Sequence, residues 1–284
     1  MNNKHCIIIA GPTASGKTDY AIQLAKELKT EIISADSRQC FKELKIGVAR
    51  PTEEQLRQVP HHFIANHSIH ENITAKDFAE EASDKLNQIF QLKNNAIICG
   101  GTGLYIKALI EGFDDIPDIP IEIRNNVIAL HKQEGIESLR SALLAADSTF
   151  QHTGDLNNPN RMMRALEVVL HTGNPISFYQ TNKKNQASYD VSYQIIDIPR
   201  NTLYGRINER VDKMMEDGLE EEARTLIPYQ EKNALQTVGY KELFDYFNGI
   251  YSKADAIEKI KQHTRNYAKR QITWFKKLKL SDPV

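Results

Sequence analysis

A short segment near the N-terminus has the residue types that bind a diphosphate or a triphosphate. It matches the pattern G-x-x-x-x-G-K-[ST] in full and consists of Gly11, Pro12, Thr13, Ala14, Ser15, Gly16, Lys17 and Thr18. Its glycines let backbone amides converge on an anion, and the N-terminus of a following helix adds partial positive charge. Lys17 supplies a cation for phosphate oxygens, and the Thr18 hydroxyl can ligate magnesium, Mg²⁺. The alternative interpretation is a glycine-rich turn with a surface lysine.

An acidic residue follows the second apolar segment. Ile32 to Ala35 precede Asp36, whereas the apolar segment at 97–99 runs into Gly100 and Gly101 with no acid. A conventional phosphoryl-transfer site of this type also needs an acid at the end of a strand, so the pattern is unusual for one. Because ligands bind beyond the carboxyl ends of parallel strands, we expect Asp36, Thr102 and the phosphate loop to converge. A role for Asp36 as a turn or helix cap is the competing interpretation.

The elements that would position these residues alternate between strands and helices. Continuous apolar runs predict buried strands at Cys6–Ala10, 31–35 and 96–99. Apolar residues at helical spacing predict a helix around 21–28, and Thr74-x-x-Asp77 is a capping box that opens another. This alternation predicts an α/β fold with a P-loop NTPase-like parallel sheet core that helices flank.

The composition and the hydrophobic pattern of the chain change after Gly112. Pro117 and Pro120 stand in an acidic connector, and helical patterns then dominate at 123–132, 136–146 and 161–171. A polar stretch at 181–188 precedes a strand pattern at 191–198, a helix at 203–214 and a tail rich in Lys and Arg. We therefore expect three segments: the first part of the core at 1–113, an inserted helical subdomain at 114–189, and the second part of the core with a basic C-terminal helix at 190–284.

The bulk composition is that of an ordinary globular protein. The chain has 284 residues, 40% of them hydrophobic and 26% charged, with a formal net charge of −1. No apolar run approaches the roughly 18 residues that span a bilayer, so we expect no membrane partner. The three cysteines form no CxxC pair, which favours a reducing cytoplasm over a disulfide framework. No metal-ligand spacing surrounds the adjacent His61 and His62, which suit loop contacts better than a metal site.

Several further blocks, which run in order along nearly the whole chain, carry a family resemblance. They are Asp36-Ser37-Arg38-Gln39, Ile46-Gly47-Val48-Ala49-Arg50-Pro51, Pro60-His61-His62, Gly100-Gly101-Thr102-Gly103-Leu104-Tyr105, Arg164-Ala165-Leu166-Glu167-Val168, Gln236-Thr237-Val238-Gly239-Tyr240-Lys241-Glu242 and the segment from Tyr267 to Phe275. Together with the phosphate loop, they make the chain resemble the tRNA dimethylallyltransferases, the bacterial isopentenyl-tRNA transferases.

The resemblance implies an activity and its partners. It implies transfer of a dimethylallyl group from dimethylallyl diphosphate, held with Mg²⁺ on the phosphate loop, to an adenosine beside the anticodon of tRNA. Asp36 would accept a proton from the exocyclic amine, which makes physical sense because an aromatic amine is a weak nucleophile until it loses that proton. Lys17, Thr102 and Arg206 would be the other catalytic residues. We also expect a monomer that binds the anticodon stem-loop.

The resemblance also implies a set of tRNA contacts. These are Asp36, Ser37, Arg38, Gln39, Thr102, Arg124, Asn160, Arg161, Met162, Met163 and Arg164. Two arginines one turn apart at a helix start suit phosphates or splayed bases. Cys40-Phe41 departs from the Val-Tyr common in the family, so contacts of that tyrosine hydroxyl have no counterpart here.

Two other functions fit parts of the sequence. A small-molecule or nucleotide kinase would share the phosphate loop and the chain length, with Asp36 as the base for an acceptor hydroxyl. A non-catalytic RNA-binding module would use a nucleotide for stability alone.

Overall fold

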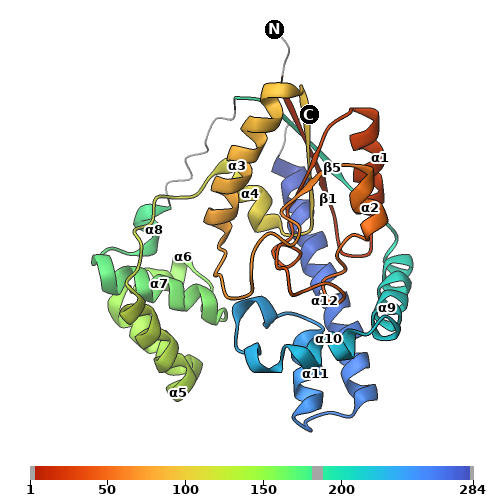
Figure 1. Cartoon of the computed structure of the whole chain (residues 1–284). Helices are drawn as coiled ribbons and strands as arrows, with labels where there is room; N and C mark the ends of the chain where they lie inside the picture. The colour runs from red at the N-terminus through yellow and green to blue at the C-terminus, as the bar shows by residue number, and fades with distance from the viewer. Residues whose placement is uncertain (1–3, 181–187, 282–284) are drawn as a thin grey trace. The chain divides into compact units, whose positions relative to one another are not determined.

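The computed structural model describes residues 4–180 and 188–281, and Figure 1 shows how its elements are arranged. Contacts between residues divide the chain into two units, one of Met1–Glu111 with Gln186–Val284 and the other of Gly112–Asn185. Of the polar stretch expected at 181–188, residues 181–187 lie outside the described residues.

A parallel sheet forms the centre of the first unit. Its strand order is β3-β2-β4-β1-β5, and every neighbouring pair is parallel. The strands are β1 His5–Ala10, β2 Ile32–Ser34, β3 His61–His62, β4 Asn95–Gly100 and β5 Asp190–Ile195. The predicted α/β class is therefore confirmed. One detail differs from expectation: His61 and His62 form a short edge strand rather than a loop, because their backbone pairs with Ile32 and Ile33.

Helices cover both faces of this sheet, as a parallel sheet requires. Alternate β1 residues face opposite ways, so Ile7 and Ile9 pack with α1 (Lys17–Glu27), and Cys6 and Ile8 pack with α3 (Ala75–Leu92). In Figure 1, α1 and α2 (Glu53–Gln58) lie on one side of the sheet, and α3 and α4 (Gly103–Glu111) lie on the other. Burying each isoleucine contributes about 1.5–3 kcal/mol.

The predicted capping box begins α3. The Thr74 hydroxyl accepts a hydrogen bond from the Asp77 backbone N–H (3.2 Å), and the Asp77 carboxylate accepts one from the Thr74 backbone N–H (2.8 Å). These two bonds satisfy backbone donors that a helix start otherwise leaves without partners.

The C-terminal part of the first unit is helical. It contains α9 Arg200–Glu216, α10 Leu219–Thr225, the 3₁₀ turns η1 Ile227–Tyr229 and η2 Asn233–Leu235, α11 Tyr240–Phe247 and α12 Lys253–Ser281. Leu219, Leu235 and Tyr240 from this region are fully buried in a core that also includes Leu44. This core joins the C-terminal helices to the loop after β2.

The second unit is helical and has its own core. Its helices are α5 Ile121–Ala146, α6 Phe150–Thr153, α7 Pro159–Thr172 and α8 Ile176–Tyr179. Leu139, Leu143, Phe150 and Leu166 pack between α5, α6 and α7. The two helices expected at 123–132 and 136–146 meet at Gly135, whose φ of 82° breaks the helical geometry. None of the helices in the described residues is long and apolar enough to cross a membrane.

Candidate active site

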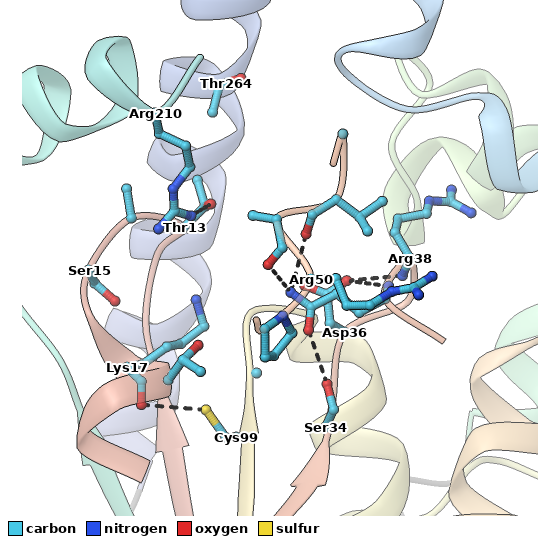
Figure 2. Close-up of a pocket in the computed structure, with 18 of the residues that line it drawn as sticks. Thr13, Ser15, Lys17, Ser34, Asp36, Arg38, Arg50, Cys99, Arg210 and Thr264 are labelled. Atoms are coloured by element: carbon cyan, nitrogen blue, oxygen red, sulfur yellow. Dashed lines mark hydrogen bonds between the residues drawn. The ribbon is translucent and has the colours of Figure 1, made fainter. Parts of the chain in front are cut away.

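A cavity of about 340 Å³ lies at the carboxyl ends of β1, β2 and β4, where ligands of open parallel sheets bind. Its walls come from the phosphate loop, from the loops after β2, and from α9, α10 and α12. Among the expected site residues, those that line the cavity are Thr13, Ala14, Ser15, Gly16, Lys17, Thr18, Asp36, Arg38 and Gln39. Figure 2 shows Thr13, Ser15 and Lys17 on one side and Asp36, Arg38 and Arg50 on the other. The expected convergence of the phosphate loop and Asp36 is thus present.

The phosphate loop is folded in the manner that anion binding requires. Gly16 has φ 89° at the start of α1, and Ala14 also has a positive φ, 61°. A left-handed alanine is strained, and such strain collects at ligand-binding loops. The Ser15 side chain is 4% exposed and its hydroxyl has no hydrogen-bond partner. A buried hydroxyl without a partner carries a desolvation cost that a phosphate oxygen would remove.

Lys17 places a cation in the cavity. Its ammonium group donates one hydrogen bond, to the Pro12 carbonyl at 3.1 Å. Burial lowers the pKa of Lys17 below its ordinary value, and the neighbouring Cys99 and Asp36 oppose that shift. A desolvated ammonium group gains more from an incoming anion than an exposed lysine would.

Asp36 is held by its own turn. Its Oδ1 atom accepts hydrogen bonds from the backbone N–H groups of Arg38 (2.9 Å) and Gln39 (3.3 Å). The turn-capping interpretation is therefore correct, and it is compatible with catalysis because the carboxylate also lines the cavity. Bonding through Oδ1 fixes the orientation of the carboxyl group.

Thr102 lies beside the loop of Asp36 but is not among the residues that line the cavity. Its Oγ1 atom accepts a hydrogen bond from the Ser37 backbone N–H (3.1 Å), and the Tyr267 side chain is close enough to interact with it. Gln39 is anchored similarly, since its side-chain amide donates to the carbonyls of Val48 and Ala49 at 3.2 and 3.0 Å.

The cavity is lined by Arg210, one turn beyond Arg206 on α9. Arg210 donates to the Thr13 hydroxyl at 3.3 Å, and burial lowers its pKa. Arg206 is an exposed residue, and its guanidinium group lies 4.0 Å from the position of a Cβ added at Gly16. The family resemblance pointed to Arg206 and not to Arg210, although spacing by four residues on a helix places both on one face.

The remaining expected tRNA contacts lie in the second unit. Arg124 Nε and Arg164 Nη1 both approach Glu167 Oε2, at 3.7 and 3.4 Å, and Glu167 is only 6% exposed. Asn160 and Arg161 are exposed in the first turn of α7, and Met163 is half-buried. The Met162 side chain is fully buried in the core of this unit and offers no surface to a partner.

The donor set fits a magnesium ion bound together with a diphosphate. Within residues 4–180 and 188–281, no group of three or more His, Cys, Asp or Glu side chains is arranged to hold a metal. Magnesium on a phosphate loop does not need such a group, because phosphate oxygens and water complete its octahedron around one protein hydroxyl. Thr18 lines the cavity, where its hydroxyl would be that ligand.

A sheet with a phosphate loop at its carboxyl edge defines the class of P-loop proteins. Comparison with known proteins gives the family within this class: the IPP transferase family model matches residues 39–278. The chain belongs to the IPP transferase family, a family of prenyltransferase enzymes.

Individual relatives agree with this assignment over nearly their whole length. The chain is 46% identical to the tRNA dimethylallyltransferase of Christiangramia forsetii, covering 98% of this chain and 91% of the relative. It is 45% identical to that of Flavobacterium johnsoniae, covering 96% and 91%.

Solved structures have the same fold. The tRNA delta(2)-isopentenylpyrophosphate transferase of Staphylococcus epidermidis is 36% identical, with a TM-score of 0.68 over 96% of this chain and 90% of that one. A eukaryotic dimethylallyltransferase acting on tRNA is 26% identical, with a TM-score of 0.78 over 95% of this chain and 69% of that one. These similarities support the prenyltransferase interpretation and not the kinase alternative.

Proposed function

We propose that this protein transfers a dimethylallyl group from dimethylallyl diphosphate to the exocyclic amine of the adenosine 3′-adjacent to the anticodon in tRNA. One observation carries the proposal: the phosphate loop with Lys17 and the carboxylate of Asp36 line the same cavity. A diphosphate leaving group and a proton acceptor are the two groups that prenylation of an amine needs. The names of the relatives and their similarity along the whole chain support the same reaction.

In the proposed reaction, the amine nitrogen forms a bond to the allylic carbon while the carbon–oxygen bond to diphosphate breaks. The nitrogen gives its proton to Asp36, whose orientation the turn of Arg38 and Gln39 fixes. Negative charge develops on the departing diphosphate, where Lys17, Arg210 and Arg206 stabilise it. Mg²⁺, held through Thr18 and the diphosphate, would neutralise part of that charge.

The acceptor base has to leave its stack to reach this cavity. The flipped base would contact the loop formed by Asp36, Ser37, Arg38 and Gln39. Thr102 lies beside this loop. The helical insertion would contact the anticodon stem-loop through Arg124, Asn160, Arg161, Met163 and Arg164. Met162 would support that surface from the core beneath. Arginine side chains suit this role because they pair with phosphates and stack on bases.

We also propose that the enzyme acts as a monomer in the cytoplasm. The two groups that the proposed reaction needs, the phosphate loop and the Asp36 carboxylate, line one cavity of a single chain, which suits a monomer. The three cysteines are buried and free, which suits a reducing compartment.

Labelled dimethylallyl diphosphate, Mg²⁺ and unmodified tRNA with adenosine beside its anticodon provide the test. The purified protein should transfer label to the tRNA, and Asp36→Asn should abolish transfer while tRNA and diphosphate still bind. If Asp36→Asn keeps activity within about tenfold, a loss under ~1.4 kcal/mol, the assignment of the base is wrong. ATP-dependent phosphorylation of a small acceptor without transfer would instead indicate a kinase.

A further inference from the structure

One side chain of α12 is hydrogen-bonded to both loops of the site. The Gln271 Oε1 atom accepts a hydrogen bond from the Thr13 backbone N–H at 2.8 Å, in the phosphate loop. Its Nε2 atom donates to the Gly101 carbonyl at 2.9 Å, immediately before Thr102. Gln271 is 6% exposed, so water cannot replace either bond cheaply.

The fit around Gln271 is close. A Cβ added at Gly101 would lie 2.2 Å from the Gln271 Nε2 atom, so Gly101 has to be a glycine while the amide occupies this place. The amide is therefore packed against the loop as well as hydrogen-bonded to it.

A second residue on the same helix face holds the other side of that loop. Tyr267 lies four residues before Gln271 and lines the cavity, and its side chain is close enough to interact with that of Thr102. Residues four apart on a helix share one face. Because Thr102 in turn accepts from the Ser37 N–H, the contacts of α12 extend to the turn that carries Asp36.

We propose that Gln271, assisted by Tyr267, is a positioning residue that fixes the phosphate loop relative to the Thr102 loop and so aligns the leaving diphosphate with the acceptor amine. The proposal deepens the proposed function and rests on it. Neither side chain needs to touch the reacting atoms. Their effect is on the distance between the two substrates, where an error of about 1 Å can lower a rate about 100-fold.

Two substitutions at one position separate positioning from general packing. Gln271→Met keeps a side chain of similar length and removes both hydrogen bonds. Gln271→Glu keeps an acceptor for the Thr13 N–H but can donate to the Gly101 carbonyl only when its carboxyl group is protonated. Burial raises the pKa of a carboxyl group, so this donor returns as pH falls. The exposed Thr273→Ala on the same helix is the matched control.

The measurement is kcat and KM for prenyl transfer by the full-length protein between pH 6 and 8, with thermal unfolding of each variant. We expect Gln271→Met to lower kcat about 10- to 100-fold at every pH, with KM for dimethylallyl diphosphate changed less than about threefold. The kcat of Gln271→Glu relative to wild type should rise as pH falls, and Thr273→Ala should match wild type. If Gln271→Met does not fold, the pH dependence of Gln271→Glu decides alone.

Three outcomes would overturn the proposal. The first is a kcat within twofold of wild type in both variants. The second is a kcat loss that KM and the unfolding temperature follow in parallel, with no recovery of Gln271→Glu at low pH, which would indicate packing alone. The third is absence of transfer by the wild-type enzyme, which would remove the proposed function first and this inference with it.

Discussion

At the residue scale, the cavity combines a buried ammonium group, that of Lys17, and a carboxylate, that of Asp36, whose orientation the backbone fixes. Lys17 has one carbonyl as its hydrogen-bond acceptor, and the Asp36 Oδ1 atom is held by two backbone amides. Neither arrangement has an evident structural use that a neutral side chain would not serve. Both are explained if a diphosphate and a proton-donating amine occupy the cavity together.

The lowered pKa of Lys17 predicts how diphosphate binding depends on pH. In the free protein, burial favours the neutral amine, so the ammonium form is lost at a lower pH than the ordinary value of 10.5. Binding of inorganic diphosphate should therefore weaken as pH rises toward that value, because the neutral amine does not attract the anion. Lys17→Ala should weaken binding at every pH, and Lys17→Arg, which keeps its charge over this range, should lose less affinity than wild type as pH rises.

Titration calorimetry across this pH range is the measurement. Equal affinity of Lys17→Ala and wild type would refute the role of the phosphate loop. An unchanged affinity of the wild type at high pH would show instead that Lys17 keeps its proton.

The site shows which contacts local sequence can and cannot indicate. The phosphate loop and Asp36 could be predicted because each belongs to a contiguous pattern that follows an apolar strand. The contact of Gln271 with Thr13 could not be predicted, although Gln271 belongs to one of the family blocks, because the two positions are 258 residues apart and only the tertiary packing of α12 brings them together. Arg210 was missed for another reason: Arg206 and Arg210 lie on one helix face, and only the packing of α9 decides which one lines the cavity.

At the element scale, some strands and helices follow from local sequence, whereas others depend on their neighbours in the fold. The continuously apolar β1 was predicted close to its observed limits, and the capping box at Thr74 correctly predicted where α3 begins. The two-residue strand β3 has too few residues for any pattern and exists because β2 offers it an edge. Helix α4 begins at Gly103, inside a glycine-rich segment with low intrinsic helix propensity, where Trp274 packs against the glycine.

Helix α10 stabilises the loop at 45–51 that borders the cavity. The Glu222 carboxylate accepts hydrogen bonds from the backbone N–H groups of Ile46 (2.8 Å) and Gly47 (3.0 Å) and from the Tyr240 hydroxyl (2.6 Å). Glu222→Ala leaves these donors without a partner and should lower the free energy of unfolding by about 1–3 kcal/mol. Urea denaturation measures this free energy of unfolding.

The exposed neighbour of Glu222 provides the control, since Glu221→Ala should change the free energy of unfolding by less than about 0.5 kcal/mol. Equal effects of the two substitutions would contradict the role of Glu222.

The insertion contains a carboxylate, that of Glu167, whose removal tests whether tRNA binding depends on net charge or on the positions of two arginines. Glu167 joins Arg124 on α5 to Arg164 on α7. Removing a negative charge should strengthen RNA binding if only net charge matters. Because Glu167 holds both guanidinium groups in place, we expect Glu167→Gln to weaken tRNA binding instead, about tenfold or ~1.4 kcal/mol.

Fluorescence anisotropy with an anticodon stem-loop measures this change. The control Glu134→Gln makes the same charge change at an exposed position of α5. Tighter binding by Glu167→Gln than by wild type would show that Glu167 opposes RNA and does not organise the arginines.

At the scale of the whole molecule, the charge that would bind tRNA is local and not global. The formal net charge is −1, so attraction to a polyanion has to come from particular surfaces. We expect the arginines of the insertion, and the exposed Lys276 and Lys277 of α12, to provide such surfaces. A neutral chain can therefore bind RNA and still avoid strong non-specific attraction elsewhere on its surface.

Salt dependence measures how many of these charges contact phosphates. Each neutralised phosphate contributes a slope of about −0.7 to −0.9 to log K against log salt concentration, so three contacting arginines predict a slope of about −2 to −3.

Arg161→Gln, at an exposed position, should weaken binding of different tRNAs by a similar factor and reduce the slope by about 1. The KM for dimethylallyl diphosphate should stay unchanged, because Arg161 belongs to the insertion and not to the cavity. A wild-type slope near zero would mean that base contacts, and not phosphates, supply the affinity. An unchanged slope in Arg161→Gln would remove this arginine from the phosphate contacts and leave Arg124, Arg164 and α12 to account for the measured value.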